Sequence, residues 1–582
     1  MKLFKYFIFI SLFIFSTSLY AAKEITISGS SIVSERILLK EALNLEKPAL
    51  YKFWTWFDSY LIDEKNILTI KSDITRYYRK LGYFNIDVKV IKNKDSVVVT
   101  VTENSLVAIN NIIFDLDLIS FIPFKKGELF EPSKFTQTKK EILRYYNEQG
   151  YCFSSLDAKA KVDLEEDVVN LEFYLDKKAL CKIDSIVVMG VDDTKKNIVL
   201  THIELKKGAV FDIRNIENSY KMLQSYGAFS QIDIDYKHNQ TSELEVIIKL
   251  NNNAQPHLAK VGIGFSSDTG PRIVGSWRHQ NFHDKMKILE LNARAALIEQ
   301  ELSATYIQRN FLDVNSWWLN VLDFNQFIGF KHKDYSSYSS DSYAIKPSVE
   351  KLEYVREFKT GVIIEENIIT QHAITSKALK STIRVDTTNF FIVSPFVSLA
   401  YDYRDSKLRP TRGYYVQNYL EYGELTLGSQ VRYLKLEETL SYARKMYGFL
   451  LGTKFKIGVI NEYVGELPFS KRFYAGGAFS NRAYEYEGLN PSDTRSSGTG
   501  GRSLIDTSFN LLHPIYENFD ILTFVDMTVL NENELSFTGP VVFGLGVGLS
   551  YNTVVGPVNT SIGFDPNKPG QYAVHFQVGY TF

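Results

Sequence analysis

The chain has 582 residues, a formal net charge of −1, two cysteines and an aromatic content of 14%, with 36 Tyr and 40 Phe. This length allows several domains or one large barrel, and the near-neutral charge gives no indication of nucleic acid or another polyanion as a partner. So many aromatic residues are typical of a protein with aromatic girdles at two membrane interfaces.

The N-terminus has the pattern of a secretory signal peptide. Lys2 and Lys5 precede the apolar run Tyr6–Phe15, and small residues lead to Ala22. This order predicts a signal peptide over residues 1–22. No later segment offers about 20 apolar residues without charges, the length that a membrane-spanning helix needs. If the mature chain spans a membrane, we therefore expect it to do so as a closed β-barrel.

Residues 23–255 repeat one pattern three times. In each repeat an amphipathic helix ends near a glycine, at Gly82, Gly150 and Gly227, and alternating strands follow. Glycine is the usual left-handed residue after a helix C-terminus, and self-similarity of this period indicates tandem modules. We predict three small α/β modules over 23–104, 105–178 and 179–255. Unrelated α+β units are the alternative.

The two cysteines, Cys152 and Cys181, enclose a short loop. In an oxidising compartment they could pair, and a loop of that length would contribute roughly 3–4 kcal/mol in the chain-entropy model. Two buried free thiols are the alternative.

Alternating strands separated by turn residues take over from about residue 256. The last of them, Gln571–Phe582, would have one wholly apolar face, formed by Tyr572, Val574, Phe576, Val578, Tyr580 and Phe582. Its other face is mostly small or polar, which is typical of a membrane barrel strand with lipid outside and water inside. A buried strand of a soluble sheet is the alternative. At about 20 residues per strand and connection, residues 256–582 would hold roughly 16 strands.

Two groups of motifs resemble a known family. The order strand, helices, strand, strand in each repeat resembles the POTRA domain. Residues 467–491, with Arg472-Phe473-Tyr474-Ala475-Gly476-Gly477, are similar to the long loop 6 of the POTRA-plus-barrel superfamily, and Phe519–Asp526 resembles one of its strand segments. The resemblance implies a transmembrane antiparallel β-barrel of about 16 strands preceded by three small α/β POTRA domains.

The tip of loop 6 reads Asn481-Arg482-Ala483-Tyr484, where the family has Val-Arg-Gly-Phe/Tyr. The resemblance implies a loop 6 lock made of Arg482, Tyr484 and Asp526, because a guanidinium in a barrel lumen needs a carboxylate. A solvated arginine in a mobile loop is the alternative. Three positions depart from the family pattern. Ala483 would be strained if the backbone needs positive φ, Thr528 replaces a glycine, and Asn510 replaces a wall glutamate.

The resemblance also implies a lateral gate, at which the barrel opens between its first strand, His257–Ser266, and its last. The gate residues would be Gly262, Gly264, Gly579 and Phe582, since glycine weakens strand pairing. We expect Gly579 to permit an inward kink. Catalytic residues, metal and cofactor are not expected, since His279 and His283 lack a coherent ligand set.

Three modules and this length are most similar to the TamA branch of the superfamily. That likeness implies a place in the cell outer membrane with the POTRA domains in the periplasm. The expected partners are a TamB-like inner-membrane-anchored periplasmic protein, unfolded outer-membrane protein clients and outer-membrane lipid. The alternatives are a BamA-like general assembly subunit, a two-partner-secretion pore, a passive porin and an outer-membrane hydrolase.

Overall fold

A computed structural model describes residues 23–45, 60–103, 106–238, 243–314, 319–334, 338–371, 387–407, 409–489, 491, 500–516, 518–553, 556–580 and 582. The expected signal peptide, residues 1–22, lies outside them. The chain forms two compact units, one up to Lys182 together with Val210–Ile213, the other made of Ile183–Ala209 and Arg214–Phe582. Within the described ranges, the helices are all too short or too polar to cross a bilayer.

The first unit begins with a module whose sheet has the order β2-β1-β4-β3. Strand β1 is parallel to β4, and β3 is antiparallel to it. Apolar residues at Ile70, Ile74 and Tyr78 put one face of the main helix on this sheet, as spacings of three to four residues require. The elements are β1 (Lys23–Ser28), α2 (Glu35–Ile37), β2 (Leu61–Ile62), α3 (Ile70–Leu81), β3 (Asp87–Lys92) and β4 (Ser96–Thr102).

The second module repeats this arrangement with the sheet order β5-β7-β6. Its helix packs Phe135, Ile142 and Tyr146 into the same core as the middle strand. A disulfide joins Cys152 to Cys181, so the pairing that the sequence left open is present in the structure. The elements are β5 (Ala108–Phe114), α4 (Pro132–Glu148), β6 (Ser155–Asp163) and β7 (Val168–Asp176).

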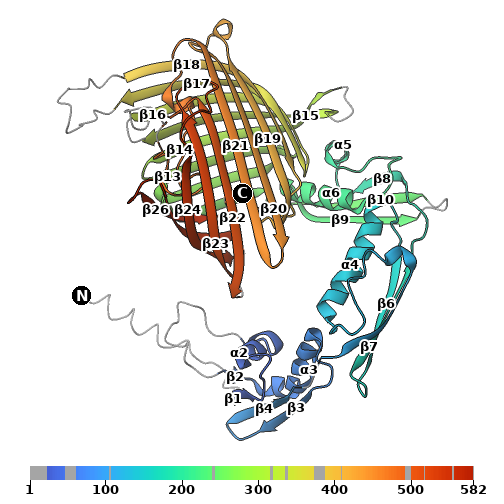
Figure 1. The fold of residues 1–582 in the computed structure, drawn as a ribbon. Helices are drawn as coiled ribbons and strands as arrows, with labels where there is room; N and C mark the ends of the chain where they lie inside the picture. The colour runs from blue at the N-terminus through green and yellow to red at the C-terminus, as the bar shows by residue number, and fades with distance from the viewer. Residues whose placement is uncertain are drawn as a thin grey trace, which may run out of the picture. The chain divides into compact units, whose positions relative to one another are not determined.

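A third module of the same topology has the sheet order β8-β10-β9, and its strands precede the barrel in the second unit (Figure 1). Gly82, Gly150 and Gly227, the residues expected after the three helices, all have positive φ. The elements are β8 (Ile183–Met189), α5 (Asp193–His202), α6 (Ile213–Tyr226), β9 (Phe229–His238) and β10 (Leu244–Asn252).

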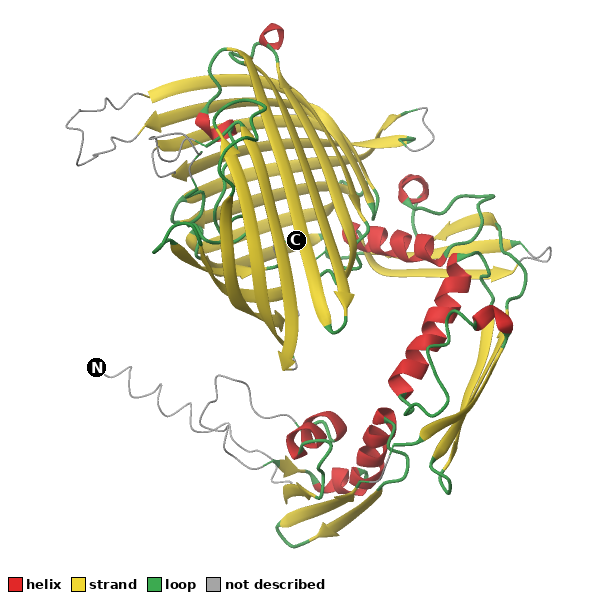
Figure 2. Ribbon diagram, in the orientation of Figure 1, coloured by secondary structure: helices red, strands yellow, loops and turns green. Residues whose placement is uncertain are grey.

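The rest of the second unit is an antiparallel barrel of 16 strands in sequence order, β11 to β26 (Figure 2). The predicted fold class is confirmed, and the first barrel strand has the expected bounds. The strands are β11 (His257–Ser266), β12 (Gly270–Phe282), β13 (Lys287–Ala296), β14 (Glu299–Asp313), β15 (Val321–Asp334), β16 (Tyr338–Leu352), β17 (Arg356–Gln371), β18 (Thr387–Asp402), β19 (Arg412–Gly423), β20 (Arg432–Met446), β21 (Phe449–Val464), β22 (Ser503–Tyr516), β23 (Phe519–Asn531), β24 (Val542–Thr553), β25 (Gly556–Phe564) and β26 (Tyr572–Val578).

The two faces of the barrel wall differ in polarity. Apolar side chains such as Val261 and Ile263 on β11 and Val574 on β26 are exposed on the outside. Residues between them point inward, and on β26 these are Ala573, His575 and Gln577. This alternation is the one that a lipid-facing strand requires.

The sequence prediction for the end of the last strand is wrong. The alternation was expected to continue to Phe582, but β26 stops at Val578 and Gly579 has φ +98°. A left-handed residue ends the period-2 alternation, and Phe582 turns inward, where it packs with Leu512 and Phe524. Its ring lies directly over Gly452, where even a Cβ atom would not fit.

Candidate functional site

The edges of β11 and β26 that face each other, here called the seam, are joined differently from the rest of the wall. Each strand from β12 to β25 pairs with both neighbours, whereas the hydrogen-bonded order begins at β11 and ends at β26. Over the described part of these two strands, no backbone ladder connects them. The two edges therefore have hydrogen-bonding groups that the barrel itself does not use.

Arg482, at the tip of loop 6, binds the inner wall. Its Nε and Nη2 atoms donate to the two carboxylate oxygens of Asp526 on β23, at 2.8 and 2.7 Å, and its backbone amide donates to the same carboxylate at 2.9 Å. Both side chains are fully buried, and the guanidinium lies 3.5 Å from the centre of the Phe524 ring. The structure thus brings together the two residues that the sequence placed at the core of the lock. A bidentate pair of this kind fixes both position and orientation.

Ser508 on β22 completes the Arg482 site, and sequence reasoning missed it. Its hydroxyl accepts from Arg482 at 2.8 Å and donates to Asp526 at 2.7 Å. Asn510, expected in place of a wall glutamate, instead donates to Ser508 at 3.0 Å. The only available signal for Ser508 was its inward register beside Asp526 on the paired strand.

The other departures from the family pattern are accommodated. Ala483 is not among the non-glycine residues that have positive φ, so its side chain causes no backbone strain there. Thr528 donates to Asp506 at 2.9 Å and accepts from Asn481 at 3.3 Å. The hydroxyl at Thr528 therefore adds one contact between loop 6 and the wall, and one between β23 and β22, where the family has a glycine.

Tyr484 contacts a different part of the wall from Arg482. Its hydroxyl donates to Asp565 at 2.6 Å, in the connection between β25 and β26, and Lys568 donates to the same hydroxyl at 3.2 Å. Tyr484 therefore does not contact Asp526. The tip of loop 6 contacts β23 through Arg482 and the β25–β26 connection through Tyr484. On β25, Gly563 lies so close to the Arg482 carbonyl that a Cβ atom there would be only 2.3 Å from its oxygen.

The gate glycines lie in two different settings. Gly262 and Gly264 are within the regular ladder between β11 and β12, opposite Val274 and Arg272. Gly579 ends β26, and its carbonyl accepts from Asn559 at 2.7 Å. The inward turn expected at Gly579 is present, whereas Gly262 and Gly264 bend nothing in this structure.

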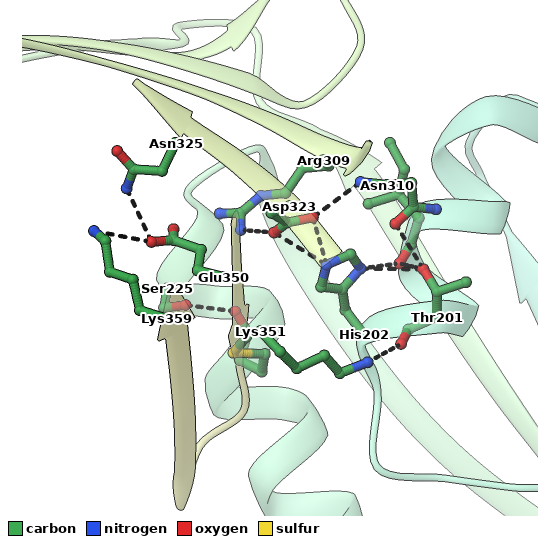
Figure 3. A network of polar contacts seen from close by, with 12 residues as sticks. Thr201, His202, Ser225, Arg309, Asn310, Asp323, Asn325, Glu350, Lys351 and Lys359 are labelled. Atoms are coloured by element: carbon green, nitrogen blue, oxygen red, sulfur yellow. Dashed lines mark hydrogen bonds and ion pairs between the residues drawn. The ribbon is translucent and has the colours of Figure 1, made fainter. Parts of the chain in front are cut away.

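The third module is joined to the barrel by a buried polar network (Figure 3). Asp323 on β15 accepts hydrogen bonds from the His202 ring of α5 at 3.0 Å and from the backbone N–H of Asn310 at 2.9 Å. It also forms an ion pair with Arg309 on β14. Arg309 also lies 4.3 Å from the centre of the Tyr226 ring of α6. Sequence reasoning missed this network, since no local motif links residues so far apart in the chain.

A second contact holds the same module. Lys195 of α5 is almost fully buried and donates to Asp284, in the turn between β12 and β13, at 2.7 Å. Burial alone would lower the pKa of Lys195, but the hydrogen bonds to Asp284 and Asp192 outweigh it and raise this pKa. Burial likewise raises the pKa of the Tyr226 phenol. At neutral pH Lys195 therefore stays charged and Tyr226 stays neutral. Both groups hold the third module at the mouth of the barrel.

Two family models match the chain. The Omp85 superfamily domain matches residues 281–582, and the surface antigen variable number repeat, a POTRA model, matches residues 20–104 and 107–178. Together they cover the first two modules and the barrel from the end of β12 onward.

Curated relatives are similar over almost the whole chain. The outer membrane protein assembly factor BamA of Nitratidesulfovibrio vulgaris is 22% identical over 577 residues, which are 94% of this chain and 71% of the relative. BamA of Neisseria meningitidis serogroup B is 20% identical, over 96% of this chain and 78% of the relative.

Among solved structures, BamA from Haemophilus ducreyi lacking POTRA domains 1–3 has the same fold. It aligns with a TM-score of 0.53 and 17% identity, over 81% of this chain and 99% of that one. Since the superfamily domain matches more than half of the residues, and the 16-stranded barrel follows POTRA modules, the chain belongs to the Omp85 superfamily.

Proposed function

We propose that this chain is an outer-membrane assembly factor that helps to insert or translocate β-barrel and autotransporter-type proteins through a lateral gate at the seam. The observation that carries the proposal is the missing ladder between β11 and β26 in the described residues. Strand edges with unused N–H and C=O groups are templates for another strand. A client strand can therefore pair where the barrel does not pair with itself.

The mechanism needs no bond-making chemistry. The modules receive an unfolded client, and the seam parts toward lipid because its outer face is already apolar, at residues such as Val261 and Val574. The client's first strand then pairs with an exposed edge, and later strands pair with the client itself. Each step satisfies backbone groups that lipid would leave unpaired.

Within the superfamily we propose the TamA branch, located in the outer membrane with its modules in the periplasm. The three modules between residues 23 and 252 support this assignment. The partner would then be a TamB-like inner-membrane-anchored periplasmic protein, bound by the POTRA domains through their open sheet edges. Strand β6 and strand β9 are such edges in the second and third sheets.

A BamA-like general assembly subunit is the second candidate, because the curated relatives carry that name. The two candidates differ in the partner that they bind. Cross-linking of the full-length chain in cell envelopes, read by mass spectrometry, separates them. Recovery of a large inner-membrane-anchored β-rich protein supports the TamA branch. Recovery of barrel-assembly lipoproteins supports the BamA-like candidate, and recovery of a secreted filament supports a two-partner-secretion pore.

The assembly activity itself is tested by reconstitution. The full chain is placed in liposomes, a urea-unfolded barrel client is added, and folded client is measured by its protease resistance and its gel mobility without heating. We expect faster insertion than in liposomes that contain an equal amount of a porin. Equal rates in both would contradict an assembly function.

A further inference from the structure

Among the residues that the structure describes, the seam has side-chain contacts at one end only. They cluster after β11, at Ser267 and Asp268, and on β26, at His575. Both places lie at the rim opposite the third module, since β11 starts next to that module and β26 runs antiparallel to its neighbours. Two kinds of contact join the edges there: the Phe576 amide donates directly to the Ser267 hydroxyl at 3.3 Å, and loop 6 contacts both sides.

His575 contacts both loop 6 and the end of β11. Its side chain is buried, and its Nε2 atom lies 3.1 Å from the backbone carbonyl of Arg482. A carbonyl can only accept, so Nε2 carries the proton and donates it. The Nδ1 atom of the same ring lies 3.3 Å from the Ser267 hydroxyl and 3.5 Å from Asp268. One imidazole thus connects the last strand, the first strand and the loop 6 tip.

Loop 6 also reaches both edges independently of His575. The amide of Ala478 donates to the Asp268 carboxylate at 3.2 Å, on the β11 side. Gln571, beside the start of β26, donates to the Ala483 carbonyl at 2.9 Å. The loop therefore binds the first strand's end through one backbone amide and the last strand through two backbone carbonyls. Arg482 anchors the same loop to β23, away from the seam.

We infer that loop 6 closes the seam by serving as the bridge between the first and last strands, in place of a backbone ladder, with His575 as the residue that positions it. Opening the gate then requires loop 6 to release His575 and Asp268, and Ser267 to release Phe576 and His575, while Arg482 can stay on Asp526. The inference rests on the proposed function, because a seam that opens is what the bridge would control.

The test measures the seam directly in the full-length protein in lipid nanodiscs. Spin labels on cysteines introduced at Ile263 and Val574, both exposed on the outer face, report the distance between β11 and β26. The native cysteines are paired and do not react with the label. His575→Leu should increase the ratio of long to short distances by about tenfold, as expected when a buried hydrogen bond is lost. An unchanged distribution would overturn the inference.

The wall offers a matched control. His332 and Asp341 form a second histidine–aspartate contact, Nδ1 to Oδ1 at 2.6 Å, between β15 and β16, but these strands also share a continuous ladder. His332→Leu, with labels at Ile328 and Ile345 on those two strands, should leave the distances unchanged. If it separates its strands as much as His575→Leu separates the seam, loss of any inward-facing wall histidine explains the effect and the inference fails.

A second variant keeps the test decisive if His575→Leu does not fold. Gln571→Ala removes one bond to the loop at a partly exposed site and should widen the seam less, by a few-fold in the same ratio. Client insertion is measured separately for each variant. A seam that widens without any change in insertion supports the bridge and contradicts the lateral-gate function. A seam that stays closed in both variants overturns the bridge, whatever insertion shows.

Discussion

The joint between β15 and β16 and the seam between β11 and β26 are held by different kinds of bond. The first joint has a backbone register from Asp323↔Glu350 to Asp334↔Ser339, in addition to side-chain contacts. The seam has only side-chain and loop contacts in the described residues, and they are gathered at one rim. A ladder opens only by losing many backbone bonds together, whereas the seam can exchange a few contacts one by one. The seam of this barrel is therefore closed by loop 6 together with Ser267 rather than by a ladder, and four substitutions probe the two regions.

The largest effect is expected from removing the anchor of loop 6. Arg482→Ala leaves the buried Asp526 carboxylate without its cation, which should cost about 3–5 kcal/mol of folding free energy. Urea unfolding in detergent or lipid, followed by gel mobility, measures the loss. Arg482→Lys keeps the charge without the two-pronged geometry and should lose less. Equal stability of Arg482→Ala and the unmodified chain would mean that loop 6 does not brace the barrel.

On the laddered side of the barrel, His202→Phe should weaken the attachment of the third module. The phenyl ring keeps the contact with Tyr226 but loses the bond to Asp323, for a cost of about 1.5–3 kcal/mol. Protease cleavage within residues 183–252 of the full chain should become faster. The label distance across the seam should stay as it is. A longer distance between β11 and β26 in this variant would contradict the view that the two regions are held independently.

Close approach of loop 6 to the wall is tested at Gly563. A methyl group there would collide with the Arg482 carbonyl, and the strain should cost about 1–3 kcal/mol. The matched control is Gly275→Ala on β12, where nothing lies within 4 Å of the added atom. We expect Gly563→Ala to lower the urea midpoint and Gly275→Ala to leave it unchanged. The same midpoint in both variants would show that the loop tip can move away at no cost.

The smallest effect is expected at the end of β26. Gly579→Ala forces a side chain into the left-handed region, at a cost of roughly 1–2 kcal/mol. The strain should release Phe582 from its cluster with Leu512 and Phe524, so that the C-terminus becomes more sensitive to carboxypeptidase. Unchanged sensitivity would mean that the tail is held by Phe582 packing alone.

Sequence periodicity was enough to predict the modules and the barrel, because both depend on which residues face a core or lipid. The period-2 pattern of Gln571–Phe582 was right as far as Val578 and failed beyond it, since Gly579 with positive φ reverses the direction of the tail. A glycine in an alternating strand does not reveal which conformation it takes.

The candidate site was predictable only where a motif carried it. Arg482 and Asp526 follow from the resemblance, and they meet. Ser508, His575 and His202 did not follow from it, because each is a single polar residue whose partner is distant in sequence and comes near only through the closed barrel.

The seam cross-link is the most direct test of the proposed function. Cysteines at Phe265 and Phe576, whose rings lie 6.5 Å apart across the seam, are joined by a short reducible bismaleimide in a Cys152→Ser/Cys181→Ser background. The control joins Ile328 and Ile345, which face each other in the β15–β16 ladder. Client insertion into liposomes is then measured before and after reduction. We predict that the seam cross-link lowers insertion to the rate of protein-free liposomes until it is reduced, while the control cross-link has no effect. Full insertion with the seam cross-linked would contradict a lateral gate.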